Sequence, residues 1–229
     1  MTANKLQYIV LILTISIVAS CEQQRTLMIE KTLENNEKEI YYVLKSDTSK
    51  IDGLHVRINK DGDTLETTQY KQGEIDGQRI LYYPNGQVRI VENYIKDEYN
   101  GTYQAFYENG APKQLGSFKD GKWDGELKTY YEKPAGRLRE SVFFIDGEED
   151  GTFKQYYPNG QLEAKGTYEK GNRSGAFTEY HENGALAATG NYLEDIEDGE
   201  IKIYDTTGTL IKIYIFENKR PVETIIVNQ

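Results

Sequence analysis

Two histidines, His55 and His181, are the only imidazole groups of the 229-residue chain and its first candidates for acid–base chemistry. A serine hydrolase would place one of them beside an activated serine and a carboxylate, and a zinc protease would carry a His-Glu-x-x-His motif. Neither arrangement is recognisable, and no glycine-rich phosphate loop precedes a helical segment. We therefore interpret both histidines as structural residues.

Carboxylates are the second group of residues that could carry chemistry. Residues 59–63 (NKDGD) resemble part of a calcium loop and residues 146–150 (DGEED) are acidic, but neither belongs to a twelve-residue loop closed by glutamate. Both stretches are typical of turns, so we expect no metal and no cofactor. An envelope hydrolase that uses Glu108, Glu132 and Glu182 is the weakest alternative, because paired catalytic carboxylates need a fixed separation in a concave site.

The single cysteine, Cys21, lies where covalent modification is expected. An uncharged run from Tyr8 to Ser20 is too short for a membrane helix, which needs about 20 apolar residues, and is typical of a secretory signal. With its small residues before the cysteine, it resembles the signal of bacterial lipoprotein precursors. We predict a lipoprotein signal peptide over residues 1–20, lipidation of Cys21, and an extracytoplasmic, lipid-anchored location in the cell envelope. Glu22, in place of aspartate, favours the outer over the inner membrane.

Composition excludes some classes of partner and of fold. The net charge of −10 argues against nucleic acid, whose phosphates require a surplus of Lys and Arg. The hydrophobic fraction of 38% is low, whereas 19 tyrosines are present. Tyrosine suits half-buried positions, where the ring packs and the hydroxyl reaches water. A thin, extended architecture is therefore favoured over a compact globule.

A repeat of about 24 residues organises most of the chain. We number each unit from a recurring glycine, position zero, and the seven such glycines are Gly53, Gly77, Gly101, Gly125, Gly151, Gly175 and Gly199. Two residues inserted near Pro134 lengthen the fourth unit to 26 residues and shift its later positions. Position five is apolar or aromatic: Ile58, Tyr82, Phe106, Tyr130, Tyr156, Tyr180 and Tyr204. Position seventeen is aromatic: Tyr70, Tyr94, Phe118, Phe144, Tyr168, Tyr192 and Phe216.

Each unit is predicted to form a β-hairpin. In the fifth unit, residues 152–157 are an aromatic-rich run, residues 158–160 (PNG) signal a turn, and residues 161–168 alternate between apolar and polar. One hairpin is marginally stable alone, so we expect hairpins to stack, with position five on position five and position seventeen on position seventeen. Glycine would supply turn geometry at the junctions. The predicted fold is all-β, a single-layer array of tandem β-hairpins.

The sequence divides into four expected parts. These are the signal peptide (1–20), a tether and N-terminal cap (21–52), seven hairpin repeats (53–220) and a C-terminal capping strand (221–229). Within the second part, polar residues 22–39 suggest a tether with at most a short helix, and residues 40–44 suggest a strand.

Position six supplies the candidate binding residues. Neighbouring strand residues point to opposite faces, so a packed position five would leave position six on the other face. The candidate strip consists of Tyr83, Tyr107, Tyr131, Tyr157 and His181. It would bind a peptide, a glycan or a partner protein, since tyrosine-rich faces are favoured anchors. The alternative is that these rings only protect the second face of the sheet.

The phrase YYPNG, at residues 82–86 and 156–160, and its variants FYENG (106–110) and YHENG (180–184) resemble the MORN repeat variant of bacterial proteins. Many such proteins are labelled antitoxins of toxin–antitoxin systems. The resemblance covers residues 53 to 220 and implies an open, twisted hairpin array that acts as a scaffold or binds proteins or lipids.

We therefore expect a non-enzymatic envelope scaffold. Its expected partners are an envelope protein, the membrane through the N-terminal lipid, and a glycan or lipid headgroup as alternatives. An antitoxin or immunity protein whose acidic face blocks a basic toxin is the second hypothesis, although the export signal does not match a cytoplasmic toxin.

Overall fold

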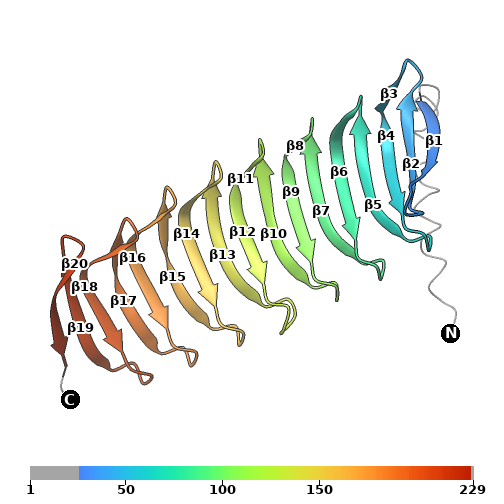
Figure 1. Cartoon of the computed structure of the whole chain (residues 1–229). Helices are drawn as coiled ribbons and strands as arrows, with labels where there is room; N and C mark the ends of the chain where they lie inside the picture. Colours follow the sequence, from blue (N-terminus) through green and yellow to red (C-terminus); the bar gives the residue numbers. More distant parts are fainter. Residues whose placement is uncertain (1–25, 228–229) are drawn as a thin grey trace, which may run out of the picture. The chain divides into compact units, whose positions relative to one another are not determined.

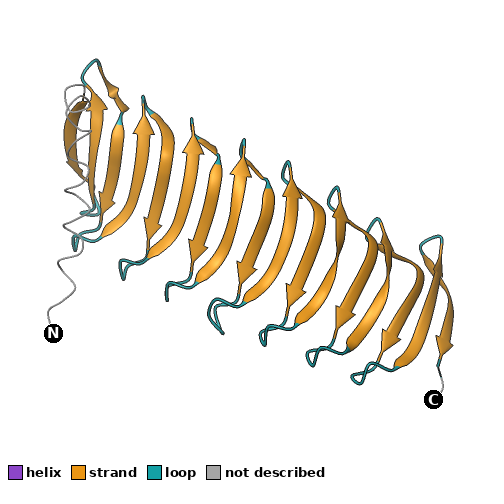
Figure 2. Cartoon of the chain, turned by 180° about the vertical axis from the view of Figure 1, so that it is seen from behind, coloured by secondary structure: helices purple, strands orange, loops and turns teal. Residues whose placement is uncertain are grey.

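The structure is a computed structural model that describes residues 26–227, which consist of strands, turns and short connections (Figure 2). Within this range no helix is long and apolar enough to cross a membrane. Cys21 and the predicted signal peptide lie outside the described residues. The all-β hairpin-repeat prediction is confirmed, since antiparallel hairpins follow one another along the chain (Figure 1).

The chain forms two compact units. The first contains the described residues up to Gly86 together with Tyr94–Asp97, and the second contains Gln87–Asn93 and the residues from Glu98 onward. The strands of the first unit are β1 (Thr26–Thr32), β2 (Lys38–Leu44), β3 (Asp47–Ile51), β4 (Gly53–Ile58), β5 (Thr64–Lys71) and β6 (Glu74–Tyr82). Strand β7 (Val88–Ile95) contributes residues to both units.

The second unit continues the same pattern. Its strands are β8 (Glu98–Tyr99), β9 (Gly101–Phe106), β10 (Pro112–Lys119), β11 (Lys122–Trp123), β12 (Gly125–Tyr130), β13 (Leu138–Ile145), β14 (Glu148–Tyr156), β15 (Leu162–Glu169), β16 (Asn172–Tyr180), β17 (Leu186–Leu193), β18 (Ile196–Tyr204), β19 (Leu210–Glu217) and β20 (Arg220–Ile226). Each hairpin turn is closed locally, as where the Gly160 amide donates to the Tyr157 carbonyl over 2.8 Å.

Four of the position-zero glycines (Gly77, Gly151, Gly175 and Gly199) lie inside strands, whereas Gly53, Gly101 and Gly125 are the first residues of β4, β9 and β12. Gly151 is within β14 and has a φ of 116°, a conformation that side chains other than glycine rarely adopt. The register between β13 and β14 shifts here, because Val142 faces Phe153 whereas Phe144 faces Glu149. The glycine therefore allows a β-bulge, which bends the strand while pairing continues on both sides.

The packed positions of the second unit also differ from the expected ones. Position two, not position five, carries the most buried rings, with Phe153 only 7% and Phe177 only 6% exposed. Each of these rings lies opposite a glycine on the neighbouring strand, Gly166 and Gly190 respectively. A large ring beside a residue without a side chain fills the space above two strands. Position five points to the other face and is half-buried.

In the first unit, polar residues occupy the equivalent core. Glu66 is 8% exposed and is contacted by Arg79 Nε at 2.8 Å, Thr68 Oγ1 at 2.9 Å and Arg57 Nη1 at 3.3 Å. His55 is also buried, and its Nδ1 has no hydrogen-bond partner among the described residues. This histidine is a core residue, which agrees with the structural role expected for it.

The segment without regular structure before the first strand is shorter than the predicted tether, residues 22–39. Strand β1 pairs with β2 along its whole length, from Thr26 opposite Leu44 to Thr32 opposite Lys38. The edge of the apolar strand β2 provides hydrogen-bond partners for the backbone amides and carbonyls of this polar segment. The segment therefore forms a strand and not a helix. At the other end of the chain, β20 pairs with β19.

Candidate binding surface

The predicted strip at position six makes hydrogen bonds from one repeat to the next. Each tyrosine hydroxyl donates to the position-five carbonyl of the following repeat: Tyr107 to Tyr130 (2.8 Å), Tyr131 to Tyr156 (2.7 Å) and Tyr157 to Tyr180 (2.9 Å). His181 keeps this contact, with its Nε2 3.0 Å from the Tyr204 carbonyl. Tyr83 is half-buried at the same position. These bonds give position six a structural role, and its use as a binding strip stays a prediction.

Replacing Tyr131 with phenylalanine should lower the free energy of unfolding of the second unit by about 1 kcal/mol, the usual net value of one such hydrogen bond. Chemical denaturation would measure it. Tyr156→Phe is the matched control, because the Tyr156 hydroxyl has no hydrogen-bond partner within residues 26–227. Equal effects of the two substitutions would contradict the structural role.

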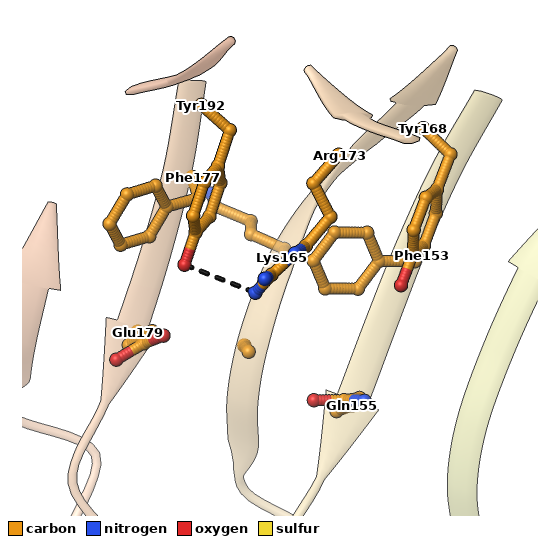
Figure 3. Close-up of a pocket in the computed structure, with 9 residues that line it drawn as sticks. Phe153, Gln155, Lys165, Tyr168, Arg173, Phe177, Glu179 and Tyr192 are labelled. Carbon is orange, nitrogen blue, oxygen red and sulfur yellow. Dashed lines mark hydrogen bonds between the residues drawn. The ribbon is translucent and has the colours of Figure 1, made fainter. Parts of the chain in front are cut away.

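A shallow hollow lies on the ring face of the second unit, the face that carries positions two and seventeen. Its walls are two ring pairs, Phe153 with Tyr168 (centroids 5.1 Å apart) and Phe177 with Tyr192 (4.5 Å). The hollow has a volume of about 120 Å³, and Ala164, Gln155, Lys165, Arg173 and Glu179 complete its lining. Figure 3 shows Arg173 reaching between the two ring pairs, with Gln155 and Glu179 on the side toward which the tyrosine hydroxyls point.

The hollow exists because the residue at position twenty-two changes along the second unit. Earlier in this unit the position is aromatic, and Phe118 stacks between Tyr99 (4.8 Å) and Trp123 (3.8 Å). In the next three repeats the position is charged, as Glu149, Arg173 and Glu197. Arg173 lies over Tyr192 as Tyr99 lies over Phe118, but its side chain is narrower than a ring and fills less of the space, so a hollow remains beside it.

Arg173 is held in place on one wall of the hollow. Its guanidinium lies 4.3 Å from the centroid of the Tyr192 ring, and Nη1 donates to the Tyr192 hydroxyl over 3.2 Å. The Asp195 carboxylate accepts from the Arg173 backbone amide at 2.9 Å and from Nε at 3.4 Å. A cation–π contact together with an ion pair fixes the side chain, so the geometry is prepared before a ligand arrives.

The carboxylates around the hollow are incompletely neutralised. Partial burial raises the pKa of Glu179, the nearby Glu197 carboxylate raises it further, and Arg173 lowers it. Burial likewise raises the pKa of Glu149, with smaller contributions from Glu140 and Asp195. A raised pKa means that the charged form of the carboxyl group is less favourable there than in water, and that Arg173 offsets this for Glu179 only in part. A cationic group would relieve this cost.

The carboxylates of the hydrolase alternative lie apart from one another. Glu108, Glu132 and Glu182 are exposed at the turns of three different repeats and do not form one site. Within residues 26–227 no group of three or more His, Cys, Asp or Glu side chains could hold a metal ion. The absence of catalysis and of cofactors stays a prediction.

Sequence reasoning missed the hollow because it followed the repeat positions that agree among units. Positions two and twenty-two differ from unit to unit, and the hollow depends on that difference. The available signal was the change from Tyr99 and Trp123 to Glu149, Arg173 and Glu197 at one repeat position.

Comparison with known proteins supports the repeat assignment. The MORN repeat variant family matches residues 75–96, 99–120, 149–170 and 173–194. No curated protein matches the chain. Each matched segment begins at position twenty-two and contains one hairpin, and the last two segments supply every ring of the hollow. The chain therefore carries four repeats of the MORN variant type, a kind of repeat generally involved in protein or membrane binding.

Proposed function

We propose that the protein is a non-enzymatic scaffold, anchored in the cell envelope through a lipid on Cys21, which binds a partner protein on the ring face of its second unit. The sequence around Cys21 supports the anchor, and the MORN repeats support a binding role. The observation that carries the proposal is the hollow between the two ring pairs, where aromatic walls meet fixed polar groups.

The size and chemistry of the hollow indicate the ligand. Its volume of about 120 Å³ is far below the about 300–1,000 Å³ of small-molecule sites, so it suits one side chain of a larger partner. Aromatic rings beside carboxylates favour a lysine or arginine side chain, and Arg173 on Tyr192 shows that these rings accept a guanidinium. We therefore propose a partner that inserts a basic side chain next to Glu179.

An immunity-type role is the second proposal, since the carboxylates of Glu149, Glu179 and Glu197 near the hollow would also suit a basic toxin. The same capture experiment distinguishes the two roles. A scaffold should capture a structural or transport protein of the envelope, whereas an immunity protein should capture a toxic protein.

Reversing the charge of Glu179 should weaken capture of the partner. We expect Glu179→Lys to lower recovery of the partner from envelope extracts about tenfold, which corresponds to about 1.4 kcal/mol of binding free energy. Quantitative mass spectrometry of proteins captured on the full-length chain would measure the change. Glu179 is exposed, so the substitution should leave the fold intact.

Lys154→Glu is the matched control, because Lys154 is exposed on the strand of Phe153 but points to the opposite face. The proposal predicts unchanged recovery with this variant. Equal recovery of all partners by Glu179→Lys and by the wild-type chain, with both variants folded, would remove the hollow as the binding site.

A further inference from the structure

The turns of several hairpins contain asparagine followed by glycine, the dipeptide in which an asparagine side chain is most reactive. Glycine has no Cβ atom, so its backbone nitrogen can approach the preceding side-chain amide without steric hindrance. Five asparagines of the chain precede a glycine: Asn85, Asn100, Asn109, Asn159 and Asn183. Their side chains are held to different extents, so we expect them to differ in reactivity.

Asn109 and Asn183 form a matched pair. Both belong to the tetrapeptide Glu-Asn-Gly-Ala, at residues 108–111 and 182–185, and both are exposed. In each turn the glycine amide donates over 2.8 Å to the carbonyl of the residue three positions before it. The asparagine Oδ1 accepts from the alanine amide at 2.9 Å in each. Local sequence and turn geometry are therefore the same at the two sites.

The two asparagines differ at the side-chain nitrogen. Asn183 Nδ2 donates over 2.7 Å to the carbonyl of Thr206, which lies at position seven of the next repeat. Within residues 26–227 Asn109 Nδ2 has no hydrogen-bond partner, so the Asn109 side chain is held through Oδ1 alone. The other three have further contacts, Asn159 with the Glu182 carbonyl (2.8 Å), Asn100 with the Asp120 carboxylate (3.3 Å), and Asn85 with a partner as well.

The two-residue insertion in the fourth repeat explains the missing contact of Asn109. Position seven of that repeat is Glu132, which lies in the lengthened turn. The Tyr131 amide closes this turn on the Arg137 carbonyl, two residues further along than in the ordinary turns, where the equivalent amide bonds the carbonyl four residues ahead. The longer turn follows a different path, so the Glu132 carbonyl does not accept from Asn109.

We propose that Asn109 is a site of selective deamidation in the folded protein. The Gly110 backbone nitrogen loses its proton and bonds to Asn109 Cγ. The bond between Cγ and Nδ2 breaks, and Nδ2 leaves as ammonia with that proton. Water then opens the resulting succinimide ring, which gives aspartate or isoaspartate. At Asn183 the bond to the Thr206 carbonyl must break before the side chain can turn toward the glycine nitrogen.

The reaction would change the turn between β9 and β10. It adds one negative charge at an exposed position, and in the isoaspartate product the main chain runs through the former side chain. The hydrogen bond between Asn109 Oδ1 and the Ala111 amide would then be lost. The site is independent of the proposed function, because Asn109 contributes nothing to the hollow.

Peptide mapping of the full-length chain tests the selectivity. The purified chain is incubated in mildly alkaline buffer made with water enriched in the heavy oxygen isotope, which labels only the carboxyl groups formed during the incubation. Mass spectrometry of the proteolytic peptides then gives the deamidation rate at each asparagine. We expect Asn109 to react at least about fivefold faster than Asn183, the factor that one hydrogen bond of about 1 kcal/mol provides.

Unfolding in urea supplies the control, because it removes the difference in structure and leaves the identical tetrapeptides. The two asparagines should then react at equal rates. Equal rates at Asn109 and Asn183 in the folded chain would overturn the proposal. So would a ratio of rates that is the same in urea as in the folded chain.

Two variants test the role of the insertion. Deletion of Pro134 and Ala135 returns the fourth repeat to the ordinary length, so deamidation at Asn109 should slow to the rate at Asn183. Insertion of Pro-Ala between Thr206 and Thr207 is the converse change and should accelerate deamidation at Asn183 about fivefold. An unchanged rate at Asn109 in a deletion variant with the circular dichroism of the wild-type chain would contradict the inference. The comparison of folded and unfolded wild-type chain does not depend on either variant.

Discussion

Replacing Glu66 with leucine should lower the free energy of unfolding of the first unit by about 2–3 kcal/mol. The carboxylate lies between two guanidinium groups, 2.8 Å from Arg79 Nε and 3.3 Å from Arg57 Nη1, and its side chain is only 11% exposed. Removing it takes a shared counter-ion from two arginines, of which Arg57 keeps its ion pair with Glu37 at 3.0 Å, and breaking a buried ion pair is destabilising. The arginine side chains are 31% and 37% exposed, so water compensates part of the loss.

The same network makes the first unit sensitive to acid. Burial alone would raise the pKa of Glu66, but hydrogen bonds from Arg79 and Thr68 and the charges of both arginines lower it below its usual value. A carboxyl group with a lowered folded-state pKa stabilises the fold at pH values above its unfolded pKa. That stabilisation is lost as the pH falls through the folded-state pKa. The wild-type chain should therefore lose stability below about pH 4 more steeply than Glu66→Leu does.

Glu126→Leu is the matched control for both measurements. Glu126 also pairs with a cation, Lys128 at 2.7 Å, but its side chain is 45% exposed. The exposed ion pair contributes little, but the buried Ser141 hydroxyl donates to Glu126 Oε1 over 2.6 Å, so we expect a loss of about 1 kcal/mol, below that at Glu66. Hydrogen exchange of amides in β4 to β6 for Glu66→Leu, and in β12 and β13 for Glu126→Leu, would give the local stability at each pH. A loss at Glu66 no larger than at Glu126 would show that the network does not stabilise the unit.

The fold could be predicted because the residues that specify it recur at a regular spacing in the sequence. Glycines every 24 residues, with a turn phrase between alternating strands, specify one hairpin per unit, and the two-residue insertion near Pro134 falls in a turn between β12 and β13. The boundaries of the strands were predicted less accurately from the sequence. The first strand of the fifth unit begins at Glu148 rather than at Thr152, because Gly151 forms a bulge and not the junction that its position suggested.

The site could not be predicted from periodicity alone. Whether the residue at position two or at position five is buried depends on which face of the sheet each side chain points to, and a β-bulge changes that alternation. A ring such as Phe153 is buried only because Gly166 lies opposite it. The acceptor of the Tyr131 hydroxyl is a carbonyl 25 residues away, which only the stacking of repeats brings near. Tyrosine at position six therefore suggested an exposed strip, although its hydroxyl bonds the next repeat.

The pairing of large rings with glycine leads to the second large effect, a change at Phe153. This side chain is 7% exposed and packs with Val142, Ala164 and Tyr168. Phe153→Ala should destabilise the surrounding repeats by about 3–5 kcal/mol, the usual result of removing a buried ring. Because each repeat contacts mainly its neighbours, the loss should be local. Hydrogen exchange across β13 to β16 would measure it.

A double-mutant cycle with Gly166 separates packing from backbone conformation. A Cβ atom at Gly166 would lie 2.7 Å from Phe153 Cε1, and the backbone there does not adopt a positive φ. Gly166→Ala alone should therefore cost about 1–3 kcal/mol through overpacking. In the Phe153→Ala background the clash is gone, and alanine should instead stabilise the strand by about 0.5–1 kcal/mol relative to glycine. Residues in contact show such non-additive effects, so additive losses from the two substitutions would mean that Gly166 is required for a reason other than room for the ring.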